Sequence, residues 1–207
     1  RDVAGPPSLQ VRTLIAAPAT DSGLPALQVA KAEPALIRTA AGAAASLSID
    51  HATRASVLAA LADPAAIVHV AAHGMTSAGR LGYAGLWLAA DGDGPAEFLS
   101  WLDVIEQRTR ARLVVLNACQ LGADTDAIAN GNSSFAQALV LSGAREVVAA
   151  LWPVSDSASG VWVPAFYAAL AADPDRDGAR ALRAAQLRLR DSRAFRPPYD
   201  WASLAAY

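Results

Sequence analysis

The segment RLVVLNACQLG, from Arg112 to Gly122, decides how the fold is interpreted. Its first part, Arg112–Asn117, is a largely apolar run of the kind that a strand shows when both faces of its sheet are covered. Cys119, the only cysteine of the chain, follows directly. A core cysteine is a small hydrophobe, and many comparable positions here carry Ala or Val. This placement favours a chemical use of the thiol, with a structural role as the alternative.

Strand-like and helix-like segments alternate on both sides of this run, without repeats of 20–50 residues. Such alternation predicts an α/β fold with a mostly parallel sheet and helices on both of its faces. The predicted strands are Val11–Ala17, Ala45–Asp50, Ala65–Gly74, Arg112–Asn117 and Glu146–Trp152, and the predicted helices are Leu24–Ala43, His51–Asp63, Ser100–Arg108, Ser133–Gly143, Val161–Ala172 and Asp177–Ser192.

Two prolines and one glycine-rich stretch modify this pattern. Pro34 kinks or splits the first helix, and Pro164 fits its helix only in the first turn. Gly82–Phe98 indicates a hairpin or an irregular excursion around the turn signals of DGDGP. The DGDG part (Asp91–Gly94) lacks the other ligands of a calcium loop, so we interpret it as a turn.

The composition limits the class of protein. The chain has 207 residues, 54% of them apolar, which predicts one domain. A net charge of −2 argues against a general nucleic-acid binder. A single cysteine excludes an internal disulfide, and no apolar run reaches the length of a membrane span. We therefore expect a cytoplasmic domain that binds neither nucleic acid nor membrane. Because the chain starts at Arg1 without a signal peptide, we expect residues 1–207 to be the C-terminal part of a longer protein.

The candidate catalytic residues lie at strand ends, where ligands bind in open α/β sheets. His73 and Gly74 end one predicted strand, and Cys119 follows another. If the two strands are parallel neighbours, the imidazole and the thiol meet at one edge of the sheet. A histidine can take the thiol proton and later donate it to a leaving amine. The backbone N–H of a residue without a Cβ, such as Gly74, suits an oxyanion hole. His69, by contrast, is expected in the core or supporting a site residue from behind.

Several segments resemble the CHAT domain family, which comprises caspase-like peptidase domains of clan CD. They occur in the order of the family and span roughly residues 24 to 204. The segment NAC followed by GAREVVAALWPVSD is the most specific. The similar segments are IVHVAAHG, GLWLA, RLVVLNACQLG, SSFAQALVLSGAREVVAALWPVSD, FYAAL, ALRAAQLRL and WASL.

The resemblance implies a caspase-like three-layer α/β/α sandwich and a Cys-His dyad. His73 matches the histidine of the family and Cys119 its nucleophile, and the backbone N–H groups of Gly74 and Cys119 match the oxyanion hole. The family often has Ser-Ala-Cys, whereas this chain has Asn117 in the first position. Such domains often stand behind tetratricopeptide or sensor modules, and several act in prokaryotic defence. No cofactor or metal is implied.

Residues after the strand that ends at Trp152 are candidates for substrate binding. Trp152 either caps the core or forms a wall of the peptide groove. Asp156 either caps the next helix or selects the side chain before the scissile bond, with Asp124 and Asp126 as the next candidates. An acidic pocket would select Arg or Lys through a charge-assisted pair.

We therefore expect a cysteine endopeptidase that cleaves a protein or peptide substrate and is controlled by a regulatory module or partner protein. One alternative is a non-catalytic adaptor of the same fold, which the intact dyad disfavours. The other is a small-molecule binding module, which the absence of a phosphate-binding loop disfavours.

Overall fold

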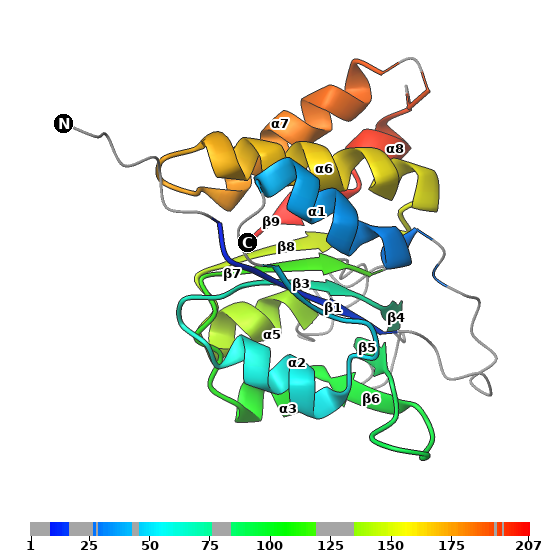
Figure 1. The fold of residues 1–207 in the computed structure, drawn as a ribbon, viewed down its shortest axis with the longest axis vertical. Coiled ribbons are helices and arrows are strands. Elements are labelled where there is room, and N and C mark those ends of the chain that lie inside the picture. Colours follow the sequence, from blue (N-terminus) through cyan, green and yellow to red (C-terminus); the bar gives the residue numbers. More distant parts are fainter. Residues whose placement is uncertain are drawn as a thin grey trace, which may run out of the picture.

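The computed structural model describes residues 9–16, 27, 29–42, 46–75, 84–118, 135–192, 194–195 and 197–207. A six-stranded sheet lies at its centre, with the strand order β2-β1-β3-β7-β8-β9 (Figure 1). All neighbouring pairs are parallel except the last, in which β9 runs antiparallel to β8. The strands are β1 (Val11–Ile15), β2 (Ser46–Ile49), β3 (Ile67–Ala71), β7 (Leu113–Asn117), β8 (Glu146–Ala150) and β9 (Leu204–Ala206).

Helices cover both faces of the sheet, which confirms the predicted layering (Figure 1). The layer on one face contains α1 (Glu33–Ala41), α6 (Asp156–Ala172) and α7 (Gly178–Arg190), with the short α8 (Pro198–Trp201) beside them. The layer on the other face contains α2 (Arg54–Leu61), α3 (Trp101–Glu106) and α5 (Phe135–Ser142). In the part of the chain that the structure describes, no helix is both long and apolar enough to cross a membrane.

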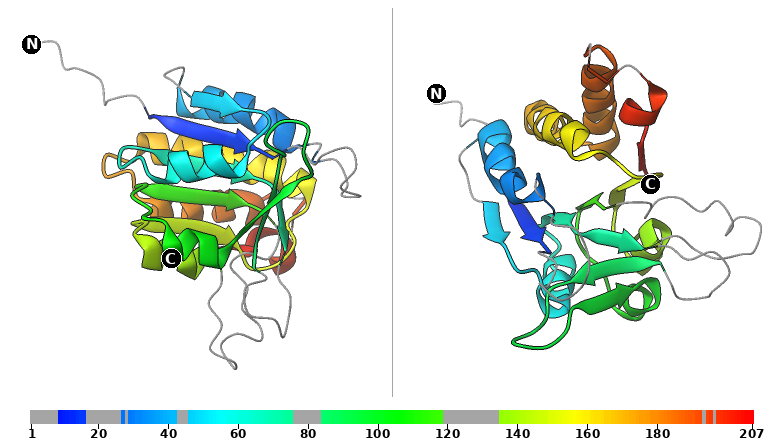
Figure 2. Two further views of the ribbon diagram at one scale, coloured as in Figure 1. Left: turned by 90° about the horizontal axis from the view of Figure 1, so that it is seen from below. Right: turned by 90° about the vertical axis from the view of Figure 1, so that its right-hand side faces the viewer.

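The strand predicted over Ala65–Gly74 is interrupted. β3 ends at Ala71, and after the buried Ala72 the chain enters a second, three-stranded antiparallel sheet. That sheet consists of β4 (His73–Met75), β5 (Gly85–Leu88) and β6 (Glu97–Ser100). It lies at the carboxyl end of the parallel strands and faces the viewer in the right-hand view of Figure 2. The predicted strand is too long because hydropathy does not show where the chain stops pairing with β7 and starts pairing with β5.

The predicted hairpin is present as β5 and β6. Its connection includes the DGDG turn, in which Gly92 has a φ of +73°. Gly85 permits the close approach of the two strands, since a Cβ there would lie 2.2 Å from the backbone oxygen of Leu99. The helix that follows β6 begins with a capping box, in which Ser100 and Asp103 exchange side-chain and backbone hydrogen bonds.

Of two helix predictions that involve a proline, one is confirmed in part and the other is corrected. The described part of the first predicted helix contains a 3-10 turn, Ala30–Ala32, followed by α1 with Pro34 in its first turn, which agrees with the alternative that the helix is split. α6 begins five residues before the predicted Val161, because Ser155 caps it by accepting a hydrogen bond from the Ala158 N–H. Pro164 is therefore inside the helix, where its ring nitrogen cannot donate to the Gly160 carbonyl.

Strand β3 buries both of its faces, and the two faces differ in chemistry. In β3, Val68 and Val70 pack in the apolar cluster that includes α2 and α5 residues. Their neighbours Ile67, His69 and Ala71 alternate to the opposite face, which α1 and α6 cover. The expectation that His69 is a core residue is confirmed, because its exposure is 0%.

Candidate active site

The two strands that precede the predicted dyad are parallel neighbours. β3 pairs with β7 so that Ala71 lies opposite Asn117. His73 follows Ala71 by two residues, and Cys119 follows Asn117 by two residues. The condition set for the dyad, that its strands be adjacent and run in the same direction, is therefore met.

The histidine half of the site is well described. His73 opens β4 and pairs across the small sheet with Trp87, and Gly74 pairs with Leu86. Both residues are partly buried. The small sheet therefore holds His73 and Gly74 at the carboxyl end of β3.

The other half falls outside the described residues. Cys119, Asp124 and Asp126 are not among them, and of Asp156 only the backbone position is described. Their roles stay predictions. The alternative that Asp156 is an N-cap is wrong, because Ser155 is the capping residue and Asp156 is the first residue of α6.

Trp152 lies just after β8, which is the parallel neighbour of β7. Its indole Nε1–H donates a 2.7 Å hydrogen bond to the backbone oxygen of Tyr199. The two rings stack with centroids 5.9 Å apart, and Tyr199 itself is 57% exposed. Trp152 thus belongs to a partly exposed aromatic pair, and its role in substrate binding stays a prediction.

A buried polar network lies behind the candidate site, and sequence reasoning found only one of its members. His69 contributes both ring nitrogens: Nε2 lies 2.6 Å from Glu33 Oε2, and Nδ1 lies 3.1 Å from the Tyr167 hydroxyl. The Asn117 side-chain amide donates to Glu33 Oε1, and Ser159 donates a 3.3 Å hydrogen bond to Asn117 Oδ1. The available signal was a histidine inside an apolar strand, because a buried histidine requires polar partners.

The protonation state of Tyr167 sets the direction of the hydrogen bonds in this network. Burial raises the pKa of this phenol well above its usual value, and the charge of Glu33 raises it further. Tyr167 therefore keeps its proton. Among the residues that the structure describes, His69 is its hydrogen-bond partner, so the phenol donates to Nδ1. The Nε2–H of His69 is then donated to Glu33.

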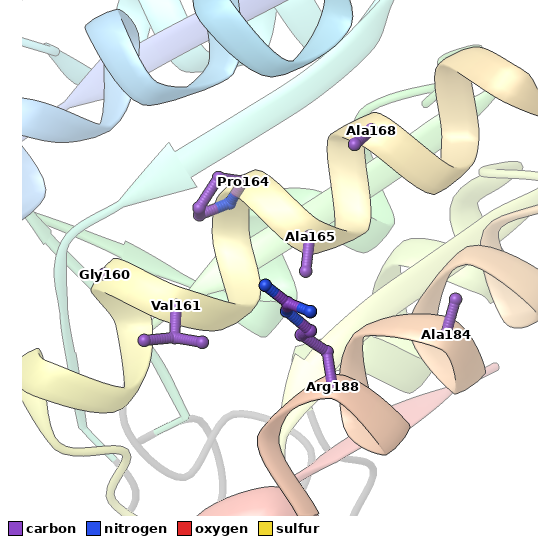
Figure 3. Close-up of a pocket in the computed structure, with 7 residues that line it drawn as sticks. All are labelled: Gly160, Val161, Pro164, Ala165, Ala168, Ala184 and Arg188. Atoms are coloured by element: carbon purple, nitrogen blue, oxygen red, sulfur yellow. The ribbon is translucent and has the colours of Figure 1, made fainter. Parts of the chain in front are cut away.

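A groove of about 550 Å³ also lies on the helical layer, between α6 and α7. Its walls are formed by small apolar residues, and the Arg188 side chain extends from α7 toward α6 (Figure 3). It offers no nucleophile or acid–base pair. The lining residues are Gly160, Val161, Pro164, Ala165, Ala168, Ala184 and Arg188.

The chain belongs to the CHAT domain family, whose pattern it matches over residues 2–207. It is 35% identical over 107 residues to tetratricopeptide repeat protein 28 of Mus musculus and 32% identical over 104 residues to that of Homo sapiens. Each match covers 50% of this chain and 4% of the relative, so the chain corresponds to a small part of these proteins.

A similar solved structure is that of the Arg-specific cysteine proteinase gingipain R. The TM-score is 0.53 at 13% identity, and the match covers 88% of this chain and 43% of the proteinase. At this identity the likeness concerns the fold. It confirms the caspase-like α/β/α sandwich that the resemblance implied.

Proposed function

We propose that this domain is a cysteine endopeptidase in which His73 and Cys119 form the catalytic dyad. The main support is the register of β3 and β7, because each dyad residue follows a paired position, Ala71 or Asn117, by two residues. Membership in the CHAT family and a fold shared with a cysteine proteinase support the same reaction class.

The chemistry follows from these groups. The thiolate of Cys119, whose proton passes to His73, attacks the carbonyl carbon of a peptide bond. The backbone N–H groups of Gly74 and Cys119 hold the resulting oxyanion. His73 returns the proton to the departing amine as the C–N bond breaks. A water molecule then hydrolyses the thioester, which releases the carboxylic acid and regenerates the thiol.

The test combines labelling with three variants. A peptidyl acyloxymethyl ketone should label Cys119, and both Cys119→Ala and His73→Ala should abolish peptide cleavage with little change in thermal unfolding. His51→Ala is the matched control, because His51 is an exposed histidine outside the proposed dyad and should keep full activity. Cleavage by Cys119→Ala, or a loss of several kcal/mol of stability with activity intact, would instead mark Cys119 as a core residue and favour the adaptor alternative.

We further propose a preference for Arg or Lys before the scissile bond. Asp124 and Asp126 follow Cys119 in sequence, and Asp156 follows β8, the parallel neighbour of β7. A carboxylate buried in a substrate pocket is costly without a cation. The similar solved proteinase is described as Arg-specific. Peptides that vary only at this residue test the proposal, and a preference for Asp or a small apolar residue would contradict it. Ala variants of the three aspartates then assign the pocket.

We propose that the domain is controlled by a module elsewhere in the protein or by a partner. The relatives are tetratricopeptide repeat proteins many times longer than this chain, and such repeats offer binding surfaces. Residues 1–207 alone should show weak turnover that rises in the full-length protein with its activator. Equal activity of both forms would contradict this control.

A further inference from the structure

The proposed reaction leaves one buried carboxylate without a role. Glu33 has an exposure of 0% and is the first residue of α1. Helix α1 lies over the sheet, in the same layer as α6 (Figure 1). The helix dipole favours a negative charge in the first turn, but full burial of a carboxylate remains costly unless donors compensate for lost hydration. The cost of burying Glu33 suggests that its carboxylate has a specific function.

The donors to Glu33 come from two neighbouring strands. Oε2 receives the Nε2–H of His69 on β3, and Oε1 receives the side-chain amide of Asn117 on β7. One carboxylate therefore bridges the two strands near their carboxyl ends. The chain continues from β3 to His73 and from β7 to Cys119.

The side chain of Asn117 is held from both sides. While its amide N–H donates to Glu33, its Oδ1 accepts a hydrogen bond from Ser159 of α6, a residue with 4% exposure. The amide is thus fixed between α1 and α6 with its nitrogen and oxygen distinguished. In this network every donor points, directly or through the next residue, toward the Glu33 carboxylate.

We propose that Glu33 is a positioning residue that sets the relative placement of the strand ends carrying the dyad, by bridging His69 and Asn117. This inference rests on the proposed peptidase function. Misplacement of a catalytic group by about 1 Å can cost on the order of 100-fold in rate. The gain in rate from fixing the two strands just before the dyad can therefore offset the cost of burying the Glu33 carboxylate.

The sharpest test exchanges the charge between two positions in the full-length protein. Asn117→Asp alone places a second carboxylate against Glu33 and removes a donor. Combined with Glu33→Gln, the new glutamine can accept from His69 and donate to the new aspartate, which still accepts from Ser159. Glu33→Gln alone is mild, because the Asn117 amide can turn over and accept the glutamine N–H.

We expect Asn117→Asp to lose activity and the double variant to regain it. Asn117→Asp should lower kcat at least about tenfold, with KM changed less than about twofold, after correction for the folded fraction. The double variant should recover most of this loss. Thr13→Val is the matched control, because Thr13 pairs with His69 in the same buried layer but takes no part in the network, and it should keep wild-type kcat.

A second readout separates this inference from the proposed function. The rate at which iodoacetamide alkylates Cys119 reports the thiol without requiring peptide cleavage. If the wild type cleaves no peptide but alkylation falls in Asn117→Asp and recovers in the double variant, the peptidase function fails and the positioning role stands. If the wild type cleaves peptides but the double variant is no better than Asn117→Asp, or kcat per folded molecule never changes, the positioning role is overturned.

Discussion

The two faces of the central sheet are built from the same strands but differ in chemistry. Toward α2 and α5, the strands present apolar residues such as Leu14, Val70 and Leu116. Toward α1 and α6, the alternating positions include Thr13, His69 and Asn117 beside apolar neighbours. The first face contributes burial that depends little on orientation. The second contains hydrogen bonds that require one geometry, and that face lies behind the candidate dyad.

The two faces respond differently when a side chain is removed. Apolar packing loses free energy in proportion to the volume removed. A buried polar network loses far more when one partner is deleted than it contributes as a whole, because the remaining groups stay desolvated and unpaired. A large substitution on either face should therefore lower the free energy of unfolding. Only a substitution in the polar network should also lower activity, because that network lies behind the candidate dyad.

The largest losses of unfolding free energy are expected from one buried substitution on each face. His69→Leu deprives Glu33 of one donor and Tyr167 of its acceptor, and should cost about 3–5 kcal/mol of unfolding free energy. Leu14→Ala, at a residue with 1% exposure, should cost about 2–5 kcal/mol. Denaturant titration measures both. Only His69→Leu should also lower activity per folded molecule, and equal activities of the two variants would contradict the proposed difference between the faces.

The next largest loss of stability is expected at Gly143, where the backbone conformation on the α5 side requires glycine. Gly143 follows α5 with a φ of +121°, and a Cβ there would lie 2.4 Å from the Thr109 carbonyl oxygen. Gly143→Ala should therefore destabilise the protein by about 2 kcal/mol or more, from backbone strain and the clash together. Thermal unfolding checks this. Gly94→Ala, in the β5–β6 connection where a Cβ meets its nearest atom at 3.7 Å, is the control that should change little.

A smaller effect of opposite sign is expected at Thr13. Its hydroxyl is buried and, among the residues that the structure describes, has no hydrogen-bond partner. Thr13→Val keeps the shape and removes the unpaired group, so it should raise the free energy of unfolding by about 1 kcal/mol. A destabilisation measured by denaturant titration would mean that the hydroxyl has a partner, and that the polar part of this face extends to β1.

The smallest effect concerns a polar contact outside both buried faces. The backbone N–H of Ala65 and the guanidinium of Arg12 lower the pKa of Asp63 in the folded state. Because this folded-state pKa is depressed, the stabilisation is present above about pH 4 and is lost as the pH falls through the folded value. Asp63→Asn should cost less than about 1 kcal/mol at pH 6. The difference from wild type should vanish at acidic pH, and a constant difference would exclude this origin.

The class of fold could be predicted from the amino-acid sequence alone, and the same patterns were enough to name a candidate dyad. Apolar runs alternating with helical periodicity predicted the parallel sheet and its two helical layers. The carboxyl ends of two such runs marked His73 and Cys119, because parallel neighbours end at one edge. These features are local or follow from general rules of α/β topology. The turn at Asp91–Gly94 was likewise visible in a short segment of the sequence.

Only the tertiary structure decided what surrounds that edge. Hydropathy could not show that the chain leaves the main sheet at Ala72, or that Ser155 starts α6 early enough to place Pro164 inside it. The partners of His69 were also hidden. Glu33 and Tyr167 are 36 and 98 residues away in sequence, and both reach it only because α1 and α6 pack side by side on one face. Hydrogen bonds between such distant residues leave no periodic signal, since each depends on the placement of a whole helix.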